Sequence, residues 1–278
     1  YPVRGLLNQK YTGLYGLYFM GYKYLQGREG FEKRYLDRTR IITNSKFTQS
    51  EIRRILGRDS EVVYPPAVSA DLTDPKFPRR DQVLTVSRIA LDKDLGILKD
   101  IASKNTAFRY YLVGTTDKTS PQVVRDLRGV TFFSNVRYDV YTEVIKDIQG
   151  IIIFPNLGYS DLKELYSTSK VYLHTKHNEH FGISIVEAMA HGCVPVVHKS
   201  GGPWIDILDQ KQGEYGYAYE TAEEAYRYIE FLMVDRGVRE EISRRARERA
   251  LSLFSEEAFQ RRMVEIVEST LSRVAVVQ

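Results

Sequence analysis

The sequence predicts an α/β fold built on a doubly wound parallel sheet of the type that binds nucleotides. Short apolar runs typical of buried strands recur between residues 83 and 198, and helical patterns separate them. Parallel strands need a crossover connection, usually a helix, so this alternation indicates a parallel sheet. The expected strands are VLTVS (83–87), FRYYLVG (108–114), GIIIF (150–154), VYLHT (171–175) and VPVVH (194–198).

The composition is that of a folded protein without an internal disulfide. Of the 278 residues, 43% are hydrophobic and 27% are charged, as in globular domains. Cys193 is the single cysteine, which favours a reducing compartment. The longest apolar run, at 13–22, is shorter than the roughly 20 residues that a membrane-spanning helix needs, and no signal peptide is visible. We therefore expect a cytoplasmic location.

The first part of the chain contains too few strand patterns to close a sheet of its own. RIITNS (40–45) is typical of a strand, and a helix is expected from Thr48, with Glu51 completing a capping box and Gly57 just past the helix end. The four prolines of 61–80 predict an interdomain linker. The first domain is therefore expected to be incomplete.

The first part of the chain is also basic and rich in tyrosine. Residues 1–60 hold 12 Lys or Arg against 5 Asp or Glu, whereas the whole chain has a net charge of +4. Aromatic rings beside cations suit a membrane headgroup interface, a phosphorylated lipid or a nucleic acid. They also suit a surface that packs on a partner domain, together with some core, and this is the interpretation that we prefer. A second expectation is that the segment 1–28 binds anionic vesicles.

The last part of the chain is expected to form three helices. Helical spacing of apolar residues runs through 221–234, 239–254 and 256–277, and Ser255 is suited to cap the third helix. No internal repeat or low-complexity tract appears.

The stretch NEHFGISIVEAMAHG (178–192) places two carboxylates around the start of a helix. Helical spacing between Gly182 and Gly192 predicts a helix there, with Glu179 in the preceding loop and Glu187 about a turn and a half inside. The start of such a helix presents free backbone N–H groups and the positive end of the helix dipole. A diphosphate on these amides, with one carboxylate at a ribose and the other at a sugar, would explain the spacing.

Two cations follow the first strand of the predicted sheet. Arg88 and Lys93 lie on the loop after 83–87, at the carboxyl end of the strand, where open α/β sheets bind ligands. A charge-assisted bond to phosphate contributes ~1.5–3 kcal/mol, more than the ~0.3–1 kcal/mol of an exposed helix dipole. These two side chains are therefore expected to dominate phosphate affinity.

A glycine pair follows another strand of the predicted sheet. Gly201 and Gly202 come directly after 194–198, and Pro203 is suited to the first position of the next helix. Without side chains, the pair would let the backbone approach a phosphate or sugar closely.

Other chemistries have weaker support. HTKHNEH (174–180) spaces three histidines as zinc ligands can be spaced, but a strand followed by a loop does not hold them on one face. DKD (92–94) is similar to a metal-binding D-x-D, although Lys93 is better suited to a cationic role. No phosphate loop of the G-x-x-x-x-G-K-[ST] type occurs, which disfavours an ATPase.

In order, SRIALDK (87–93), NEHFGISIVEAMAHGCVPVV (178–197) and SGGPWIDIL (200–208) resemble the retaining glycosyltransferases of family 4. These enzymes have the two-lobed GT-B fold and carry an E-x7-E element. The resemblance covers about residues 35–265. ITNSKFTQSEI (42–52), VVYPP (62–66) and NEHFGIS look closest to mannosyltransferases that extend dolichol-linked oligosaccharides, and to their prokaryotic relatives.

The resemblance implies a role for each matching residue. Arg88 and Lys93 would hold the donor diphosphate, Glu179 would contact the donor sugar, and Glu187 would bind the ribose. The segment FPNLGYSDL (154–162) would flank the base together with residues after YYLVG. The residues expected to act in the transfer are Glu179, Arg88 and Lys93, and those expected to bind the donor are Glu187, Phe181, Gly182, Ile183, Gly201, Gly202 and Gly114.

The resemblance also implies the domain organisation. The expected parts are 1–70 as the end of an incomplete N-terminal lobe, 71–254 as a Rossmann-like lobe that binds the nucleotide-sugar, and 255–278 as a helix that packs back toward the first lobe. The glycine-rich loop and the donor-facing histidine of that first lobe have no counterpart in this sequence. We therefore expect a fragment, or a chain that needs a separate partner on its acceptor side.

The expected function is retaining transfer of a hexose, with mannose favoured, from a nucleotide-sugar to a lipid-linked or glycan acceptor. GDP-mannose is the expected type of donor, and no cofactor or metal ion is expected. The expected partners are the donor, the acceptor and a peripheral contact with the cytosolic face of a membrane, without nucleic acid. The alternative is a non-catalytic module that binds a nucleotide-sugar.

Overall fold

The structure is a computed structural model that describes residues 39–68, 78–104, 108–127, 131–132 and 150–276. Contacts between residues divide the chain into two compact units, Tyr1–Ile42 and Thr43–Gln278, and everything described below from Thr43 onward belongs to the second. The basic, tyrosine-rich segment 1–28 lies outside the described residues, so the membrane binding expected for it stays a prediction.

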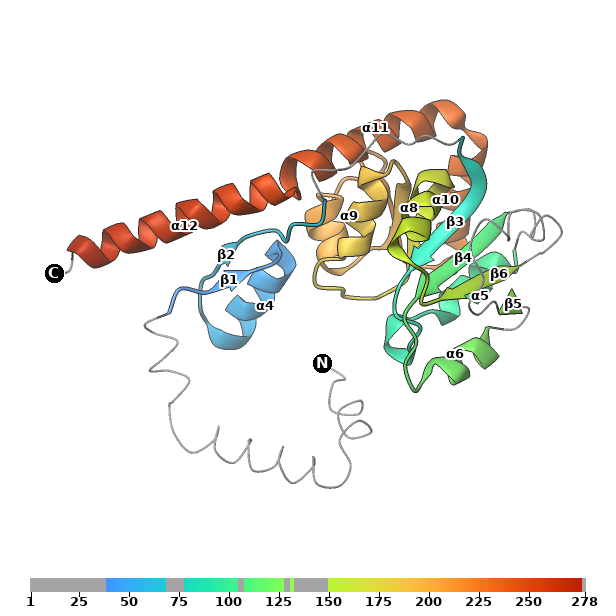
Figure 1. The fold of residues 1–278 in the computed structure, drawn as a ribbon, viewed down its shortest axis with the longest axis horizontal. Helices are drawn as coiled ribbons and strands as arrows, with labels where there is room; N and C mark the ends of the chain where they lie inside the picture. The colour runs from blue at the N-terminus through green and yellow to red at the C-terminus, as the bar shows by residue number, and fades with distance from the viewer. Residues whose placement is uncertain (1–38, 69–77, 105–107, 128–130, 133–149, 277–278) are drawn as a thin grey trace, which may run out of the picture. The chain divides into compact units, whose positions relative to one another are not determined.

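A seven-stranded sheet forms the centre of the second unit (Figure 1). Its strand order is β5-β6-β4-β3-β7-β8-β9, and every neighbouring pair is parallel. The strands are β3 (Arg80–Val86), β4 (Arg109–Gly114), β5 (Thr131–Phe132), β6 (Ile151–Pro155), β7 (Ser169–His174), β8 (Val194–His198) and β9 (Tyr217–Tyr219). The five strands expected from the sequence are confirmed, and β5 and β9 are too short to give a pattern of their own.

Successive residues of the central strands pack into two hydrophobic cores, one on each face of the sheet. In β4, Tyr111 belongs to one core and Leu112 to the other, because neighbouring side chains of a strand point to opposite faces. The first core is completed by α8 (Tyr159–Thr168), α9 (Ile183–Ala190) and α11 (Arg236–Leu253), and the second by α5 (Gly96–Ala102), α6 (Ser120–Asp126) and α10 (Ala222–Val234). Both faces of the strands are therefore buried, which explains their continuous apolar runs.

The strand order reverses direction between β3 and β7. From β3 the chain proceeds to β4 on one side, and it later returns to the other side of β3 at β7. In doubly wound sheets, the crevice at the carboxyl ends of two such strands is where ligands bind. Ser87 and Thr175 directly follow β3 and β7, so the topology places the ligand crevice beside them.

Helix α4 (Lys46–Leu56) begins two residues earlier than the sequence indicated. Ser45 caps it, because the Ser45 hydroxyl accepts a hydrogen bond from the Thr48 N–H group (2.9 Å). The expected cap at Thr48 was therefore wrong. Gly57 ends the helix with φ +64°, as expected, since this left-handed conformation favours glycine. The strand expected at 40–45 is shorter than predicted, since β1 contains two residues (Ile42–Thr43).

The segment after α4 runs along the junction of the last two helices. The predicted linker begins with β2 (Glu61–Val62), and the Ala67 N–H group donates to the Phe254 carbonyl (2.9 Å). Arg262 of α12 (Glu256–Val276) pairs with Glu61 at 3.3 Å. The three C-terminal helices and the Ser255 cap are confirmed, with the Ala258 N–H group 3.2 Å from the Ser255 hydroxyl. The division of the chain into lobes stays a prediction.

Among the helices in the described ranges, none combines the length and the apolar character that crossing a membrane requires.

Candidate active site

A cavity of about 610 Å³ lies at the carboxyl ends of the central strands. Ligand pockets typically have volumes of this size, roughly 300–1,000 Å³. Its lining includes eight of the residues that the sequence singled out: Arg88, Lys93, Gly114, Glu179, Phe181, Gly182, Ile183 and Glu187. The start of α9 and the loop after β3 thus open into the same cavity, as one pyrophosphate that contacts both would require.

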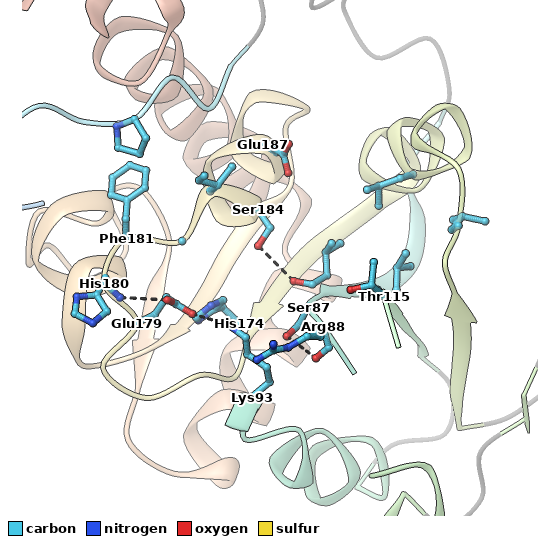
Figure 2. Close-up of a pocket in the computed structure, with 18 of the residues that line it drawn as sticks. Ser87, Arg88, Lys93, Thr115, His174, Glu179, His180, Phe181, Ser184 and Glu187 are labelled. Atoms are coloured by element: carbon cyan, nitrogen blue, oxygen red, sulfur yellow. Dashed lines mark hydrogen bonds and ion pairs between the residues drawn. The ribbon is translucent and has the colours of Figure 1, made fainter. Parts of the chain in front are cut away.

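Lys93 and Glu179 form an ion pair inside the cavity (Figure 2). The Lys93 Nζ atom lies 3.1 Å from Oε2 of Glu179, and about four fifths of each side chain is buried. Burial acts to raise the pKa of Glu179, but the charge and the hydrogen bond of Lys93, together with the hydrogen bond from the His180 N–H group, act against it, so the pKa of Glu179 lies below its ordinary value. The carboxylate is therefore charged at neutral pH.

Two hydrogen bonds hold Lys93 and its loop against the loop that follows β7. The Thr175 hydroxyl donates to the Lys93 carbonyl (2.8 Å), and the His177 N–H group donates to the Asp94 carboxylate (3.0 Å). Asp94 has φ +52° at the end of the short helix η1 (Leu91–Lys93), so the chain turns sharply there.

Arg88 lies at the rim of the same cavity. Its guanidinium is 2.8 Å from the Asp92 carboxylate and 3.9 Å from that of Asp117, and the side chain is 40% exposed. A diphosphate bound at Arg88 would compete with these two carboxylates. Such exposed pairs contribute only ~0–1 kcal/mol, so a doubly charged ligand can displace them.

The first turn of α9 supplies backbone donors at the cavity. Gly182 precedes the helix with φ +104°, and a Cβ atom there would lie 2.6 Å from Cδ1 of Ile185. Only glycine fits this left-handed position, which turns the chain from Phe181 into the helix. The first N–H groups of a helix have no intrahelical acceptor, so an anion can accept their hydrogen bonds.

Glu187 also lines the cavity, and a buried tyrosine donates a hydrogen bond to it. The Tyr166 hydroxyl donates to Oε2 of Glu187 at 3.1 Å. Burial raises the pKa of Glu187, and the Tyr166 hydrogen bond opposes that effect. The contact orients the carboxylate and leaves its second oxygen for a ligand hydroxyl.

Close packing against a neighbouring loop explains why two glycines occupy positions 201 and 202, and the sequence did not reveal this packing. A Cβ atom at Gly201 would lie 2.5 Å from the Glu179 carbonyl oxygen, and one at Gly202 would lie 2.3 Å from the His180 carbonyl oxygen. The Gly202 N–H group donates to the Glu179 carbonyl (2.8 Å). The two glycines therefore support the loop that carries Glu179 from behind, and the sugar contact expected for them stays a prediction.

Gly114, the last residue of β4, also lines the cavity. A Cβ atom there would lie 1.7 Å from the Ser87 carbonyl oxygen, so the loops after β3 and β4 can approach each other only with glycine at this position. The Gly114 carbonyl accepts from the Asn156 N–H group (2.9 Å). Asn156 and Leu157 line the cavity, so the segment expected to flank the base lies beside it.

Sequence reasoning missed His174 as a cavity residue. It is the last residue of β7, it lines the cavity, and only 7% of its surface is exposed. The available signal was its position at the carboxyl end of a predicted strand, five residues before Glu179.

The three histidines of 174–180 have separate surroundings. His177 pairs with Asp94 (3.1 Å), and His180 lies 3.1 Å from the Thr48 hydroxyl. In the part of the chain that the structure describes, no group of three or more histidine, cysteine, aspartate or glutamate side chains is placed to hold a metal ion.

Comparison with known proteins assigns the family. The family model of glycosyl transferases group 1 matches residues 75–249, which include Arg88, Lys93, Glu179 and Glu187 of the cavity. The chain belongs to this family. A relative from Dictyostelium discoideum, named GDP-Man:Man(3)GlcNAc(2)-PP-Dol alpha-1,2-mannosyltransferase, is 25% identical over 254 residues. The match covers 84% of this chain and 48% of the relative, so the chain spans about half the relative's length.

Solved structures of glycosyltransferases share the fold. A glycosyltransferase from Rickettsia africae superimposes with a TM-score of 0.68 at 19% identity, over 87% of this chain and 67% of that chain. HepE from Anabaena, in complex with UDP, gives 0.67 at 21% identity, over 83% of this chain and 64% of HepE. The expected α/β fold of the GT-B type and the resemblance to family 4 mannosyltransferases are thereby confirmed.

Proposed function

We propose that this glycosyltransferase transfers mannose from GDP-mannose to a lipid-linked oligosaccharide, with retention of the anomeric configuration. The observation that carries the proposal is the cavity in which two cations, two carboxylates and the start of α9 meet. The names of the relatives support the donor and the acceptor, since they describe GDP-Man and a dolichol-linked glycan.

Arg88 and Lys93 would hold the donor diphosphate in this proposal. As the bond between the sugar and the diphosphate breaks, negative charge builds up on the leaving group, and fixed cations stabilise that charge. The N–H groups at the start of α9 would add to this stabilisation. Because these groups compensate the charge, we propose that no metal cofactor is needed.

Glu179 and Glu187 would fix the two ends of the donor. Glu187 would accept hydrogen bonds from the ribose, and Glu179 from the sugar beside the reacting carbon. An acceptor hydroxyl would then attack that carbon on the face from which the diphosphate leaves, and its proton would pass to the departing diphosphate. Positioning and charge stabilisation would account for most of the rate.

A lipid-linked acceptor would place the protein at a membrane surface. We propose that the transfer occurs at the cytosolic face of a membrane, with the acceptor side completed by residues outside those described here. The basic segment 1–28 would supply the surface contact, because anionic headgroups attract Lys and Arg.

Titration of GDP, UDP, ADP and GDP-mannose into the purified chain, followed by calorimetry, tests the proposed donor. We expect GDP and GDP-mannose to bind and the other two nucleotides to bind more weakly. Equal or tighter binding of UDP or ADP would contradict the proposed donor. Mixing the chain with GDP-mannose and a lipid-linked oligosaccharide then separates an enzyme from a binding module, and NMR of the product gives its anomeric configuration.

A further inference from the structure

His174 has a ring nitrogen with no hydrogen-bond partner, which is unusual for a buried histidine. Its Nδ1 atom is inaccessible to solvent and has no partner among the described residues, and its side chain lines the cavity. Figure 2 shows the imidazole beside the Glu179 carboxylate, on the same side of the cavity as Lys93. Since Nδ1 is inaccessible, a ligand can reach this ring only through Nε2.

The ring is neutral at physiological pH. Burial holds the pKa of His174 well below its ordinary value, because charging the imidazole in a site with little water is unfavourable. The Glu179 carboxylate acts in the opposite direction, and the Lys93 ammonium offsets it. A neutral imidazole has one N–H donor and one lone-pair acceptor, so its tautomer decides what it offers a ligand.

The surroundings of the two nitrogens favour the tautomer with the proton on Nε2. A proton on Nδ1 would be a buried N–H donor without an acceptor, and such groups are rarer than buried acceptors that lack a donor. A proton on Nε2 can be donated to a ligand oxygen in the cavity. His174 therefore presents a neutral N–H donor next to a charged carboxylate.

A donor and an acceptor side by side match a hydroxyl group. A hydroxyl oxygen accepts one hydrogen bond while its hydrogen is donated in another. A diphosphate oxygen has no hydrogen to offer Glu179, and Arg88 and Lys93 are better placed to bind its charge. The pair of Glu179 and His174 thus selects a sugar hydroxyl rather than a phosphate.

We propose that His174 binds a hydroxyl of the donor sugar through its Nε2–H group and thereby helps to determine which sugar the site accepts. The inference rests on the proposed sugar-nucleotide function of the cavity. A site built to hydrogen-bond a hydroxyl discriminates strongly against a sugar that lacks it, because the buried polar groups are left unpaired.

Two substitutions distinguish the roles of the two ring nitrogens of His174. The side-chain amide of His174→Gln reaches the position of Nε2, whereas the shorter amide of His174→Asn reaches only that of Nδ1. We expect His174→Asn to bind GDP-mannose about 10-fold more weakly and GDP unchanged. We expect His174→Gln to bind both within about threefold of the unsubstituted protein. Calorimetry measures both ligands on both variants, after matched thermal melting shows that each variant is folded.

The tautomer is measured independently of any ligand. Long-range proton–nitrogen NMR of the unsubstituted chain should show His174 neutral at pH 6, with its proton on Nε2. A proton on Nδ1, a charged ring, or equal losses of GDP and GDP-mannose in His174→Asn would overturn the inference. If the unsubstituted chain binds GDP but no GDP-sugar, or binds no nucleotide, the proposed function fails instead, and the inference fails with it.

Discussion

Nζ of Lys93 lies 3.1 Å from Oε2 of Glu179, although 86 residues separate them in the sequence. This ion pair connects the loop after β3 with the loop before α9, which are the two sides of the switch point of the sheet. A donor diphosphate would share Lys93 with Glu179. Binding of the diphosphate would therefore affect the position of the Glu179 carboxylate, which is proposed to contact the sugar.

Lys93→Ala and Arg88→Ala should each weaken GDP binding. Loss of one charge-assisted bond removes ~1.5–3 kcal/mol, which corresponds to about 10- to 150-fold in affinity. Calorimetry with GDP measures the effect. Lys199→Ala is the control, because Lys199 pairs with Glu220 at the surface and does not line the cavity. Affinity equal to that of the control would remove the substituted residue from the phosphate site.

Glu187→Gln should weaken GDP binding but leave pyrophosphate binding unchanged, since only GDP carries the ribose that Glu187 is proposed to contact. Tyr166→Phe removes the hydrogen bond that orients Glu187. It should also weaken GDP binding without affecting pyrophosphate binding, by a smaller amount of roughly 0.5–1.5 kcal/mol. Calorimetric titration of GDP and of pyrophosphate into each variant measures the two affinities. If pyrophosphate and GDP weaken together, Glu187 acts on the phosphates or on the fold instead.

The sequence predicted the parts of this site that depend on strand ends and helix starts. Arg88, Lys93 and Glu179 follow predicted strands, and the carboxyl ends of neighbouring parallel strands meet at one edge, so their convergence was foreseeable. The order of the strands was not foreseeable, because apolar runs such as GIIIF carry no information about their neighbours. Lys93 was expected to face a ligand, and its pairing with Glu179 was not foreseen, because the two residues lie on loops that meet only in the folded sheet.

Local sequence patterns did not reveal features that depend on contacts between distant residues. Gly201 and Gly202 were expected to let the backbone approach a ligand, and that contact stays a prediction, whereas their packing against the backbone carbonyls of Glu179 and His180 was not foreseen. No local pattern shows which atoms lie beside a glycine. The cap of α4 was assigned to Thr48 because Thr48 and Glu51 match a capping box, whereas Ser45 occupies the cap position.

Gly202→Ala should destabilise the protein and loosen the loop that carries Glu179. Its φ of −58° suits alanine, so the effect is purely steric: the new Cβ would lie 2.3 Å from a backbone oxygen. Overpacking of this kind costs about 1–3 kcal/mol. Gly96→Ala is the matched control, since a Cβ there meets nothing within 4 Å. Urea denaturation compares the two variants, and equal stabilities would contradict the close packing behind Glu179.

Stability should fall as the pH falls below about 6.5, in part through His174. Burial lowers its pKa in the folded state, so the unfolded state takes up the proton first. The stabilisation is fully present above the unfolded pKa and is lost as the pH drops toward the folded pKa. Between pH 7.5 and 5.5, the free energy of unfolding measured by urea denaturation should fall by about 1 kcal/mol more for the unsubstituted protein than for His174→Gln.

Asp206→Ala should destabilise the protein and weaken donor binding through α4. Asp206 is fully buried, and its carboxylate accepts from the N–H groups of Lys46 (2.6 Å) and Phe47 (3.2 Å) at the start of that helix. Removing the carboxylate leaves the N–H groups of these two residues without their acceptor. It also removes a negative charge that stabilises the positive end of the helix dipole. The expected loss in the free energy of unfolding is about 1–3 kcal/mol.

The effect on donor binding follows from the neighbouring contact between α4 and the site loop. Thr48 lies 3.1 Å from the His180 ring, next to Glu179, so a displaced α4 releases that loop. Asp209→Asn is the control, because the contacts of the Asp209 carboxylate among the described residues are ion pairs of 3.5–3.9 Å and its side chain is one third exposed. Such pairs contribute ~0–1 kcal/mol, and asparagine tolerates the left-handed φ of +55° at this position. If Asp206→Ala matches Asp209→Asn in both urea denaturation and GDP-mannose affinity, then α4 is not held by Asp206 and does not position Glu179.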